Sequence, residues 1–238
     1  HALSAARASR HALIINVGGG VVTDLGGFAA ATYKRGISCI NVPTTVLGAV
    51  DAAVGGKTGI NFDGYKNQVG AFYPASDVIV SSVFFDTLPV SEKLSGYAEM
   101  FKHGLLDSDE AVRRLMIFDI TAPDHNAAEL LDLLHRSVTV KENIVKQDPT
   151  EKGIRKALNL GHTIGHAFEE MALRRHDPIP HGYAVAWGLV AECILSSMLQ
   201  GFDSKLLHTF AEYIRDIYGV FTITCDDYPA LIELMRQD

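Results

Sequence analysis

The residues best suited to chemistry lie in the segment NLGHTIGHAFEE, where His162 and His166 stand four positions apart. Residues at this spacing project from one face of an α-helix, so both imidazoles can reach the same cavity. The pair could bind a metal ion, carry a proton or simply pack in a core. An HxxxH zinc site is our first interpretation, and it needs a third ligand from the His, Glu and Asp set. Two candidates are His181 in PHGYAVAWG and Glu99 in GYAEMFK.

Further charged residues stand at positions where they could assist such a site. Lys102 follows Glu99 by three positions and shares its helix face, although ordinary surface ion pairs have the same spacing. Asn159 lies one turn before His162 on the helix that we expect there. Two segments that we interpret as ordered glycine-rich loops, VDAAVGGKTGIN and GYKNQVGAF, contain Asp51, Lys57, Lys66 and Asn67. Lysines in such loops could neutralise a phosphate or a carboxylate, or could simply be solvated.

A glycine-rich turn near the start of the chain is suited to nucleotide binding. In INVGGGVVTDLGG an apolar strand passes through Gly18, Gly19 and Gly20 into a helix, whose N-terminal amides can receive a pyrophosphate. Glycine can also be present only for its torsion angles, and the spacing is not the common GxGxxG. The next strand ends in VPTT, which places Thr44 and Thr45 where ligands of parallel sheets bind, although either threonine could be a helix N-cap.

Two kinds of structure must position these residues. ALIINV and SCINVPTT are predicted strands on either side of the helical LGGFAAATYKRG, which indicates a βαβ unit and a parallel sheet, and DVIVSSVFF predicts a further strand. After Pro89 the apolar residues recur with the period of an α-helix, and Ser91 is a predicted N-cap. This pattern continues to VFTITC, a β-branched run near the end of the chain. We place a domain boundary near residues 88–90. Four helices are expected over SEKLSGYAEMFKHGLL, AAELLDLLHRSVTVKENIVKQ, ALNLGHTIGHAFEEMA and GYAVAWGLVAECILSSML.

Composition narrows the class of protein. The 238 residues are 47% hydrophobic and carry a net charge of −7, with no run of Lys and Arg interleaved with aromatics, so we expect a soluble globular protein that does not bind nucleic acid. The longest apolar run starts at Tyr183, is interrupted by Glu192 and falls short of the roughly 20 residues that span a bilayer, so we expect a buried helix and no membrane partner. Cys39, Cys193 and Cys225 are far apart, which suits a reducing cytoplasm.

Six segments taken together resemble the 3-dehydroquinate synthase family of sugar phosphate cyclases, in order and spacing, from about Leu13 to Glu192. They are GGGVVTDLGGFAAATYKRG, VPTTVLGAVDAAVGGKTGIN, GYKNQVGAF, GYAEMFKHGLL, NLGHTIGHAFE and HGYAVAWG. The resemblance implies a Rossmann-like α/β NAD-binding domain over residues 1–89, lacking its N-terminal part, and an all-helical metal-binding domain over residues 90–238. Because family members also carry a lysine-containing tail beyond LIELMRQD, we expect a truncated chain that binds NAD less well than its full-length parent.

The resemblance also implies roles for single residues. Glu99, His162 and His181 resemble the family's ligands for zinc or cobalt, whereas His166 resembles a residue that transfers protons near the substrate phosphate. Glu151 resembles a proton acceptor, and Arg35 resembles a residue that reaches the phosphate bound by a neighbouring subunit, which implies a homodimer. Residues that resemble NAD contacts are Gly19, Gly20, Asp24, Thr44, Thr45, Lys66 and Thr87. Residues that resemble substrate contacts are Asp51, Lys57, Asn67, Lys102, Lys141, Arg155 and Asn159.

The activity implied is conversion of 3-deoxy-D-arabino-heptulosonate 7-phosphate to 3-dehydroquinate plus phosphate, a step of the shikimate pathway of aromatic amino acid biosynthesis, with NAD used and regenerated. Arg155 and His166 favour this branch over another sugar phosphate cyclase. A metal-dependent alcohol or glycerol dehydrogenase is disfavoured, because an uncharged alcohol needs no lysine array. A catalytically silent NAD-binding domain is still an alternative, because we expect the chain to lack the N-terminal segment and the C-terminal tail of family members.

Overall fold

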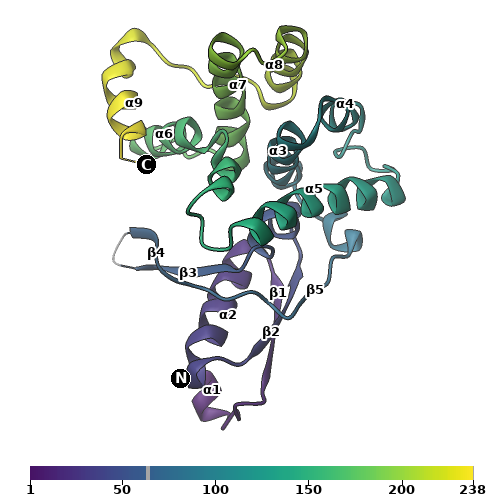
Figure 1. Ribbon diagram of the computed structural model, residues 1–238, viewed down its shortest axis with the longest axis vertical. Coiled ribbons are helices and arrows are strands. Elements are labelled where there is room, and N and C mark those ends of the chain that lie inside the picture. The colour runs from purple at the N-terminus through teal and green to yellow at the C-terminus, as the bar shows by residue number, and fades with distance from the viewer. Residues whose placement is uncertain (63–64, 238) are drawn as a thin grey trace.

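The computed structural model describes residues 1–62 and 65–237, leaving aside the side chains of residues 65–67. Figure 1 shows the α/β elements gathered at one end of the molecule and the remaining helices at the other, with α5 lying across the junction. This arrangement confirms the predicted fold class. The α/β elements are α1 (Ala2–Ala5), β1 (Leu13–Gly18), α2 (Gly20–Thr32), β2 (Ser38–Pro43), β3 (Lys57–Phe62), β4 (Tyr65–Phe72) and β5 (Asp77–Val78). The helices are α3 (Val90–Asp107), α4 (Asp109–Ile117), α5 (Ala127–Gln147), α6 (His162–Arg174), α7 (His181–Gln200), α8 (Ser204–Tyr218) and α9 (Tyr228–Met235).

The predicted βαβ unit is confirmed. Strands β1 and β2 pair in parallel, from Leu13 opposite Ser38 to Gly18 opposite Pro43, and α2 is the crossover between them. β5 extends the sheet on the far side of β2. The prediction of a long strand over DVIVSSVFF was wrong, because β5 has two residues and Ser82–Phe85 forms a 3₁₀-helix. That turn directs Phe85 into the core of the helical part, where it is buried.

The two predicted glycine-rich loops are instead an antiparallel hairpin of β3 and β4, so that interpretation was wrong. Gly59 and Gly70 face each other across the hairpin. A Cβ added to Gly70 would lie 2.2 Å from the carbonyl oxygen of Thr58, so glycine here permits the close approach of two strands. The lysine of GGKTGIN therefore stands on a strand at the edge of the junction.

The larger hydrophobic cluster of the helical part joins α3, α4, α5, α7 and α8, and a smaller one lies between α6 and α9. The centre of the larger cluster is α3, where Tyr97 and Phe101 are buried with ring centroids 5.2 Å apart and Phe101 meets Phe210 of α8 at 5.4 Å. Helix α5 has the predicted bounds, because the Asn126 side chain accepts hydrogen bonds from the first free amides. Ser91 is not an N-cap, because α3 already begins at Val90 after Pro89.

Two further expectations about the helical part were wrong. Helix α6 begins only at His162, because Gly161 adopts a left-handed φ of +79°, and Asn159 closes the separate 3₁₀-helix Ile154–Asn159. In the part of the chain that the structure describes, VFTITC forms no strand and runs into the short 3₁₀-helix Cys225–Asp227 before α9.

Among the described residues, α7 is the single helix whose length and composition would allow it to cross a membrane. Its buried residues lie between Gly182 and Cys193, and it packs against α3, α6 and α8. Met198 and Leu199 at its end are exposed. A core helix of a soluble protein passes the same test, and the packing of α7 is that of a core helix over its first two thirds.

Candidate metal and substrate site

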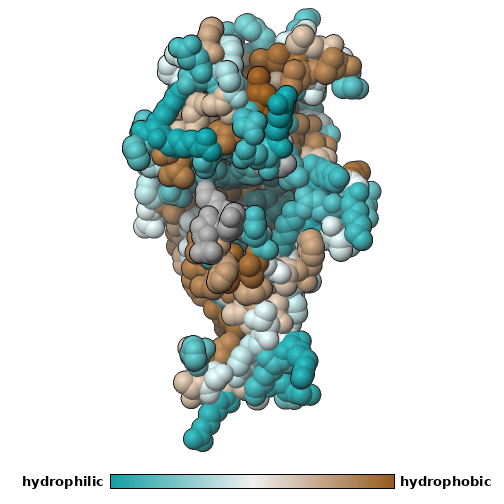
Figure 2. Space-filling model, turned by 90° about the vertical axis from the view of Figure 1, so that its left-hand side faces the viewer, coloured by the Kyte–Doolittle hydropathy of each residue, from teal (hydrophilic) through white to brown (hydrophobic). Residues whose placement is uncertain are grey.

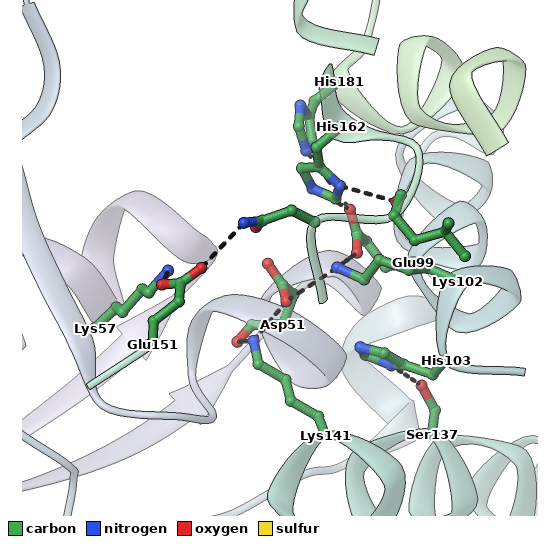
Figure 3. A network of polar contacts seen from close by, with 12 residues as sticks. Asp51, Lys57, Glu99, Lys102, His103, Ser137, Lys141, Glu151, His162 and His181 are labelled. Atoms are coloured by element: carbon green, nitrogen blue, oxygen red, sulfur yellow. Dashed lines mark hydrogen bonds and ion pairs between the residues drawn. The ribbon is translucent and has the colours of Figure 1, made fainter. Parts of the chain in front are cut away.

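Glu99 is the centre of the candidate site. It is fully buried on α3, and its Oε1 lies 3.4 Å from Nε2 of His162 and 3.6 Å from Nε2 of His181. The two histidines are the first residues of α6 and α7, so three helices converge on this point (Figure 3). The three predicted metal ligands are thus brought together although they are widely separated in sequence.

The opposite nitrogen of each imidazole is held by an acceptor. Nδ1 of His162 lies 3.2 Å from the carbonyl oxygen of Leu160, and Nδ1 of His181 lies 3.2 Å from Oε2 of Glu169. With a proton on each Nδ1, both Nε2 atoms could give their lone pairs to a cation bound beside Glu99, which is the arrangement that metal-binding histidines commonly have. Glu169 was missed by the sequence reasoning, although its place on the same helix as the paired histidines was a usable signal.

The residues present fit a divalent cation. Oε1 of Glu99 is buried without a hydrogen bond in the structure and faces the two imidazoles, while Oε2 pairs with Lys102. The distances from Oε1 to the two Nε2 atoms match the roughly 3.3 to 3.6 Å that separates two ligand atoms of a tetrahedral zinc ion. Burial alone would lower the pKa of His181, but Glu169 and Glu99 raise it to about 10, so this group attracts positive charge. His166, Glu169 and His181 form a second possible ligand group. His166 is exposed, with its ring centroid 5.3 Å from that of His162, which leaves it beside the Glu99 group.

A buried ionic cluster adjoins Glu99. Lys102 forms an ion pair with Glu99, and its Nζ lies 3.8 Å from Oδ1 of Asp51, whose other partner is Lys141 at 2.5 Å. Burial favours a protonated Asp51, but the two ammonium groups outweigh it and lower its pKa. Burial lowers the pKa of Lys141, whereas Glu99 and Asp51 outweigh burial and raise that of Lys102. The cluster therefore contains fixed charges of both signs.

Lys57 and Glu151 lie on the other side of Asp51 (Figure 3) and form a second polar group with Asn159. Lys57 forms an ion pair with Glu151, which also accepts a 3.0 Å hydrogen bond from Nδ2 of Asn159. Burial favours a higher pKa for Glu151, but the ammonium group of Lys57 outweighs it and lowers the pKa. Glu151 is therefore ionised at neutral pH and can accept, rather than donate, a proton.

A cleft of about 490 Å³ lies between the α/β part and the helical part, and Asp51 and Lys57 join it to the ionic cluster and to the second polar group. It is lined from both sides, by Asp24, Asp51 and Lys57 of the first part and by Lys141 and Arg155 of the second. Figure 2 shows a hollow lined by hydrophilic residues between the two parts. Three of these five side chains are cationic, which suits an anionic ligand.

Of the predicted nucleotide contacts, Asp24 lines the cleft, whereas Gly19 and Thr45 lie together at the N-terminal end of α2. Gly19 is the N-cap of α2, and a Cβ added to it would lie 3.2 Å from Cγ2 of Thr45, so glycine keeps the helix N-terminus open to a close approach. Thr45 caps the following turn, because its Oγ1 accepts a 3.0 Å hydrogen bond from the amide of Gly48. Burial, and then the charge of Asp51, raise the pKa of Asp24 to about 6.

Some predicted site residues are not brought to this cluster. Arg35 is exposed beyond the far end of α2, about 20 Å of helix away from Gly20. Thr87 is exposed in the turn before α3 and does not line the cleft. The side chains of Lys66 and Asn67 lie outside the described residues. The role of Arg35 at a neighbouring subunit stays a prediction.

His103 is a buried group that the sequence reasoning missed. It is fully buried on α3, Nδ1 lies 2.7 Å from Oγ of Ser137, and Nε2 has no hydrogen bond in the structure. Burial lowers its pKa to about 3, so the ring is neutral. Nothing in the sequence distinguishes it from a core histidine, because only the fold places it near Asp51 and Glu99.

Comparisons with known proteins agree with this geometry. Profiles for the N-terminal and C-terminal parts of 3-dehydroquinate synthase match residues 1–95 and 96–238. The solved 2-deoxy-scyllo-inosose synthase complexed with carbaglucose-6-phosphate, NAD⁺ and Co²⁺ superposes with a TM-score of 0.83 at 26% identity, over 100% of this chain and 65% of that one.

Two sequence relatives extend the comparison. The 3-dehydroquinate synthase of Parabacteroides distasonis is 53% identical over 237 residues, which is 100% of this chain and 67% of the relative. That of Pyrococcus furiosus is 45% identical over 199 residues, or 82% of this chain and 56% of the relative, so the chain spans between about half and two thirds of their lengths. The matched profiles cover the whole chain, and the chain belongs to the 3-dehydroquinate synthase family.

Proposed function

We propose that this protein converts 3-deoxy-D-arabino-heptulosonate 7-phosphate to 3-dehydroquinate and inorganic phosphate, as an NAD- and metal-dependent carbon–oxygen lyase. The observation that carries the proposal is the Glu99, His162 and His181 group, which Lys102 and Asp51 join to a cleft lined by Lys57, Lys141 and Arg155. A substrate with both a carboxylate and a phosphate needs several cations, whereas the small alcohol of a dehydrogenase needs none. Membership of the family and the names of its relatives support the same reaction.

Two cofactors belong to the proposal. Glu99, His162 and His181 would hold zinc or cobalt, and the N-terminus of α2 at Gly19 and Gly20 would receive the pyrophosphate of NAD, with contacts from Asp24, Thr44, Thr45, Lys66 and Thr87. When bound, NAD accepts and returns a hydride while the metal ion polarises the carbon–oxygen bond of the alcohol being oxidised. The cyclase solved with NAD⁺ and Co²⁺ supports this assignment.

The buried ionic cluster would bind and orient the substrate hydroxyls. Asp51 stays ionised because Lys141 and Lys102 lower its pKa, so it accepts hydrogen bonds from hydroxyl groups. Lys102 stays protonated between Glu99 and Asp51 and donates. Fixed donors and acceptors need no reorganisation during the reaction, which is the main source of electrostatic stabilisation in enzymes.

Loss of phosphate needs cations and a proton acceptor near the leaving group. Lys57 and Asn67 of one subunit and Arg35 of a neighbouring subunit would bind the phosphate dianion. His166 would move a proton beside it. Glu151 holds Lys57 by its ion pair and, being ionised, can also accept a proton. Asn159 in turn donates to Glu151 and holds it in place.

Arg155 would bind the substrate carboxylate, with Lys141 beside it. Its guanidinium group is buried, donates to the carbonyl oxygens of Pro149 and Gly55, and lies 5.6 Å from the centroid of the Phe72 ring. A planar guanidinium fixed in this way still offers further N–H groups on its rigid fork. The proposal also comprises a nucleotide domain over residues 1–89, a metal domain over residues 90–238, a homodimer and a cytoplasmic location.

The test is release of inorganic phosphate from the heptulosonate phosphate, with catalytic NAD and added zinc, while NADH absorbance is followed. Phosphate release without accumulation of NADH is the expected result. Accumulation of NADH without phosphate would replace the proposal with a dehydrogenase. Absence of both signals would indicate a different cyclase substrate or a silent domain, and a panel of other sugar phosphates would distinguish those two.

A further inference from the structure

Three alternate carbonyl groups in residues 51–56, which we call the junction segment, are each held by a side chain from another element. The oxygen of Asp51 accepts from Nζ of Lys141 at 2.6 Å, that of Ala53 from Nδ2 of Asn41 at 3.3 Å, and that of Gly55 from the Arg155 guanidinium at 3.0 Å. Lys141 and Arg155 come from the helical part and Asn41 comes from β2. Only Asn41 has no role in the proposed reaction.

Asn41 is itself held by a second buried amide. Asn16 on β1 lies directly opposite Asn41 in the parallel pair and donates its Nδ2 to Oδ1 of Asn41 at 2.8 Å. Both side chains are nearly inaccessible, at 4% and 6% exposure. Helix α2 has Gly26 at this point, where a Cβ would lie 1.8 Å from Oδ1 of Asn16. Buried amides cost stability unless they are hydrogen-bonded. The two hydrogen bonds, from Asn16 to Asn41 and from Asn41 to the carbonyl of Ala53, therefore fix which way the Asn41 amide faces.

The junction segment needs such support because of its backbone. Gly48–Ala52 is a π-helix, in which the amide of Ala53 bonds to the carbonyl of Gly48 at 2.9 Å. A single π turn is rare, is often found at functional sites and has little stability of its own. Gly55 and Gly56 follow with φ of 102° and 70°, so the chain turns again four residues after Asp51. The bond from Asn41 to Ala53 therefore fixes the backbone between the π turn and the turn at these glycines.

We propose that Asn41 is a positioning residue for Asp51, acting through the carbonyl of Ala53, and that Asn16 only satisfies the buried amide oxygen of Asn41. Asn41 holds the junction segment from the sheet side while Lys141 holds it from the helix side at the carbonyl and carboxylate of Asp51. The side chain of Asp51 is then held in one position beside Lys102 and Lys141. The consequence for turnover rests on the role of Asp51 in the proposed function, whereas the consequence for the backbone does not.

The test compares Asn41→Leu, Asn16→Leu and the double variant, since leucine repeats the branched shape of asparagine. Each single variant leaves one buried amide without its partner, so both lower the melting temperature by several degrees, on the order of 2–8 °C, and the double variant recovers most of that loss. Hydrogen exchange of peptides covering residues 48–56 separates the roles. Exchange speeds up at least about 10-fold in Asn41→Leu and in the double variant, and stays at the parent rate in Asn16→Leu.

Turnover provides the second readout. Asn41→Leu and the double variant lose kcat/KM by at least about 10-fold, while Asn16→Leu stays near the parent. If the double variant recovers turnover along with stability, or if exchange speeds up without loss of turnover, Asn41 does not position Asp51. If the parent itself turns over no heptulosonate phosphate, the proposed function fails, and the exchange rates alone decide whether Asn41 fixes the junction segment.

Discussion

Oε2 of Glu169 lies 3.2 Å from Nδ1 of His181, on the edge of the ring opposite to Glu99. The contact fixes the tautomer that leaves Nε2 as the ligand atom, and a carboxylate partner also makes the imidazole a stronger donor to a metal. Glu169 thus belongs to the candidate metal site although it lies outside the group formed by Glu99, His162 and His181.

We therefore expect Glu169→Gln to weaken zinc binding by about 10–100-fold without abolishing it, because the ligands remain and only their orientation and basicity change. Isothermal titration of the metal-free protein with zinc measures this directly. The neighbouring Glu170, which forms an exposed pair with Arg174 at 2.9 Å, provides the matched control. Equal affinities for Glu169→Gln and Glu170→Gln would show that His181 does not need Glu169.

Removal of the charge of Glu99 has a larger effect. Glu99→Gln keeps the shape of the side chain but removes a buried anionic ligand, so zinc affinity falls by more than about 100-fold. Loss of the ion pair with Lys102 also lowers stability by about 3–5 kcal/mol, so circular dichroism must first show that the variant is folded at the temperature of the titration. Glu212→Gln, in an exposed pair with His208 on α8, serves as the control that changes neither quantity.

Asp24 makes stability depend on pH. Because burial and Asp51 raise the pKa of Asp24 to about 6, the folded protein holds this proton more tightly than the unfolded chain does. Ionised Asp24 therefore weakens folding above that pH, and the penalty disappears as the pH falls towards roughly 4. Asp24→Asn melts at a higher temperature than the parent at about pH 8, and the difference shrinks on acidification. A difference that does not change with pH would contradict this account.

The ion pair of Lys57 with Glu151 is partly exposed, and substitution of Lys57 tests whether it also has a role in substrate binding. The Lys57 side chain is 55% exposed, so Lys57→Met changes the free energy of unfolding by at most about 1 kcal/mol. The same substitution removes a cation from the cleft and raises KM for the phosphorylated substrate by at least about 10-fold. Lys146→Met, in the exposed pair with Glu142, is the matched control and leaves KM unchanged. Similar KM values for the two variants would exclude Lys57 from phosphate binding.

Much of the fold was predictable from local patterns. The parallel unit of β1, α2 and β2 and the bounds of α5 follow from apolar periodicity and, for α5, from an asparagine cap. The hairpin of β3 and β4 was not predictable in this way, because the glycines and the lysine in GGKTGIN have low strand propensity. Only the close approach of the two strands at Gly59 and Gly70 explains the paired glycines. The separation of Asn159 from α6 depends on one left-handed glycine, Gly161.

The residues of the candidate site also differ in whether the sequence could reveal them. Glu99, His162 and His181 were predictable because their chemistry is visible in short motifs that resemble a family, and the structure brings them together. Glu169 had a usable signal in its place on the helix of the paired histidines. His103 and Asn41 had none, because each acts through a contact that only the tertiary fold creates. Positioning residues of this kind have no spacing rule that a sequence could reveal.

The central claim is that the oxidised cofactor is regenerated within one turnover. The most direct measurement uses the heptulosonate phosphate deuterated at the carbon whose alcohol is oxidised, with a pool of unlabelled NAD and NADH in solution. The account predicts that the carbocyclic product retains the deuterium and that the soluble pool stays unlabelled, because the same hydride is removed and returned. Deuterium in the soluble NADH, or product without label, would contradict it.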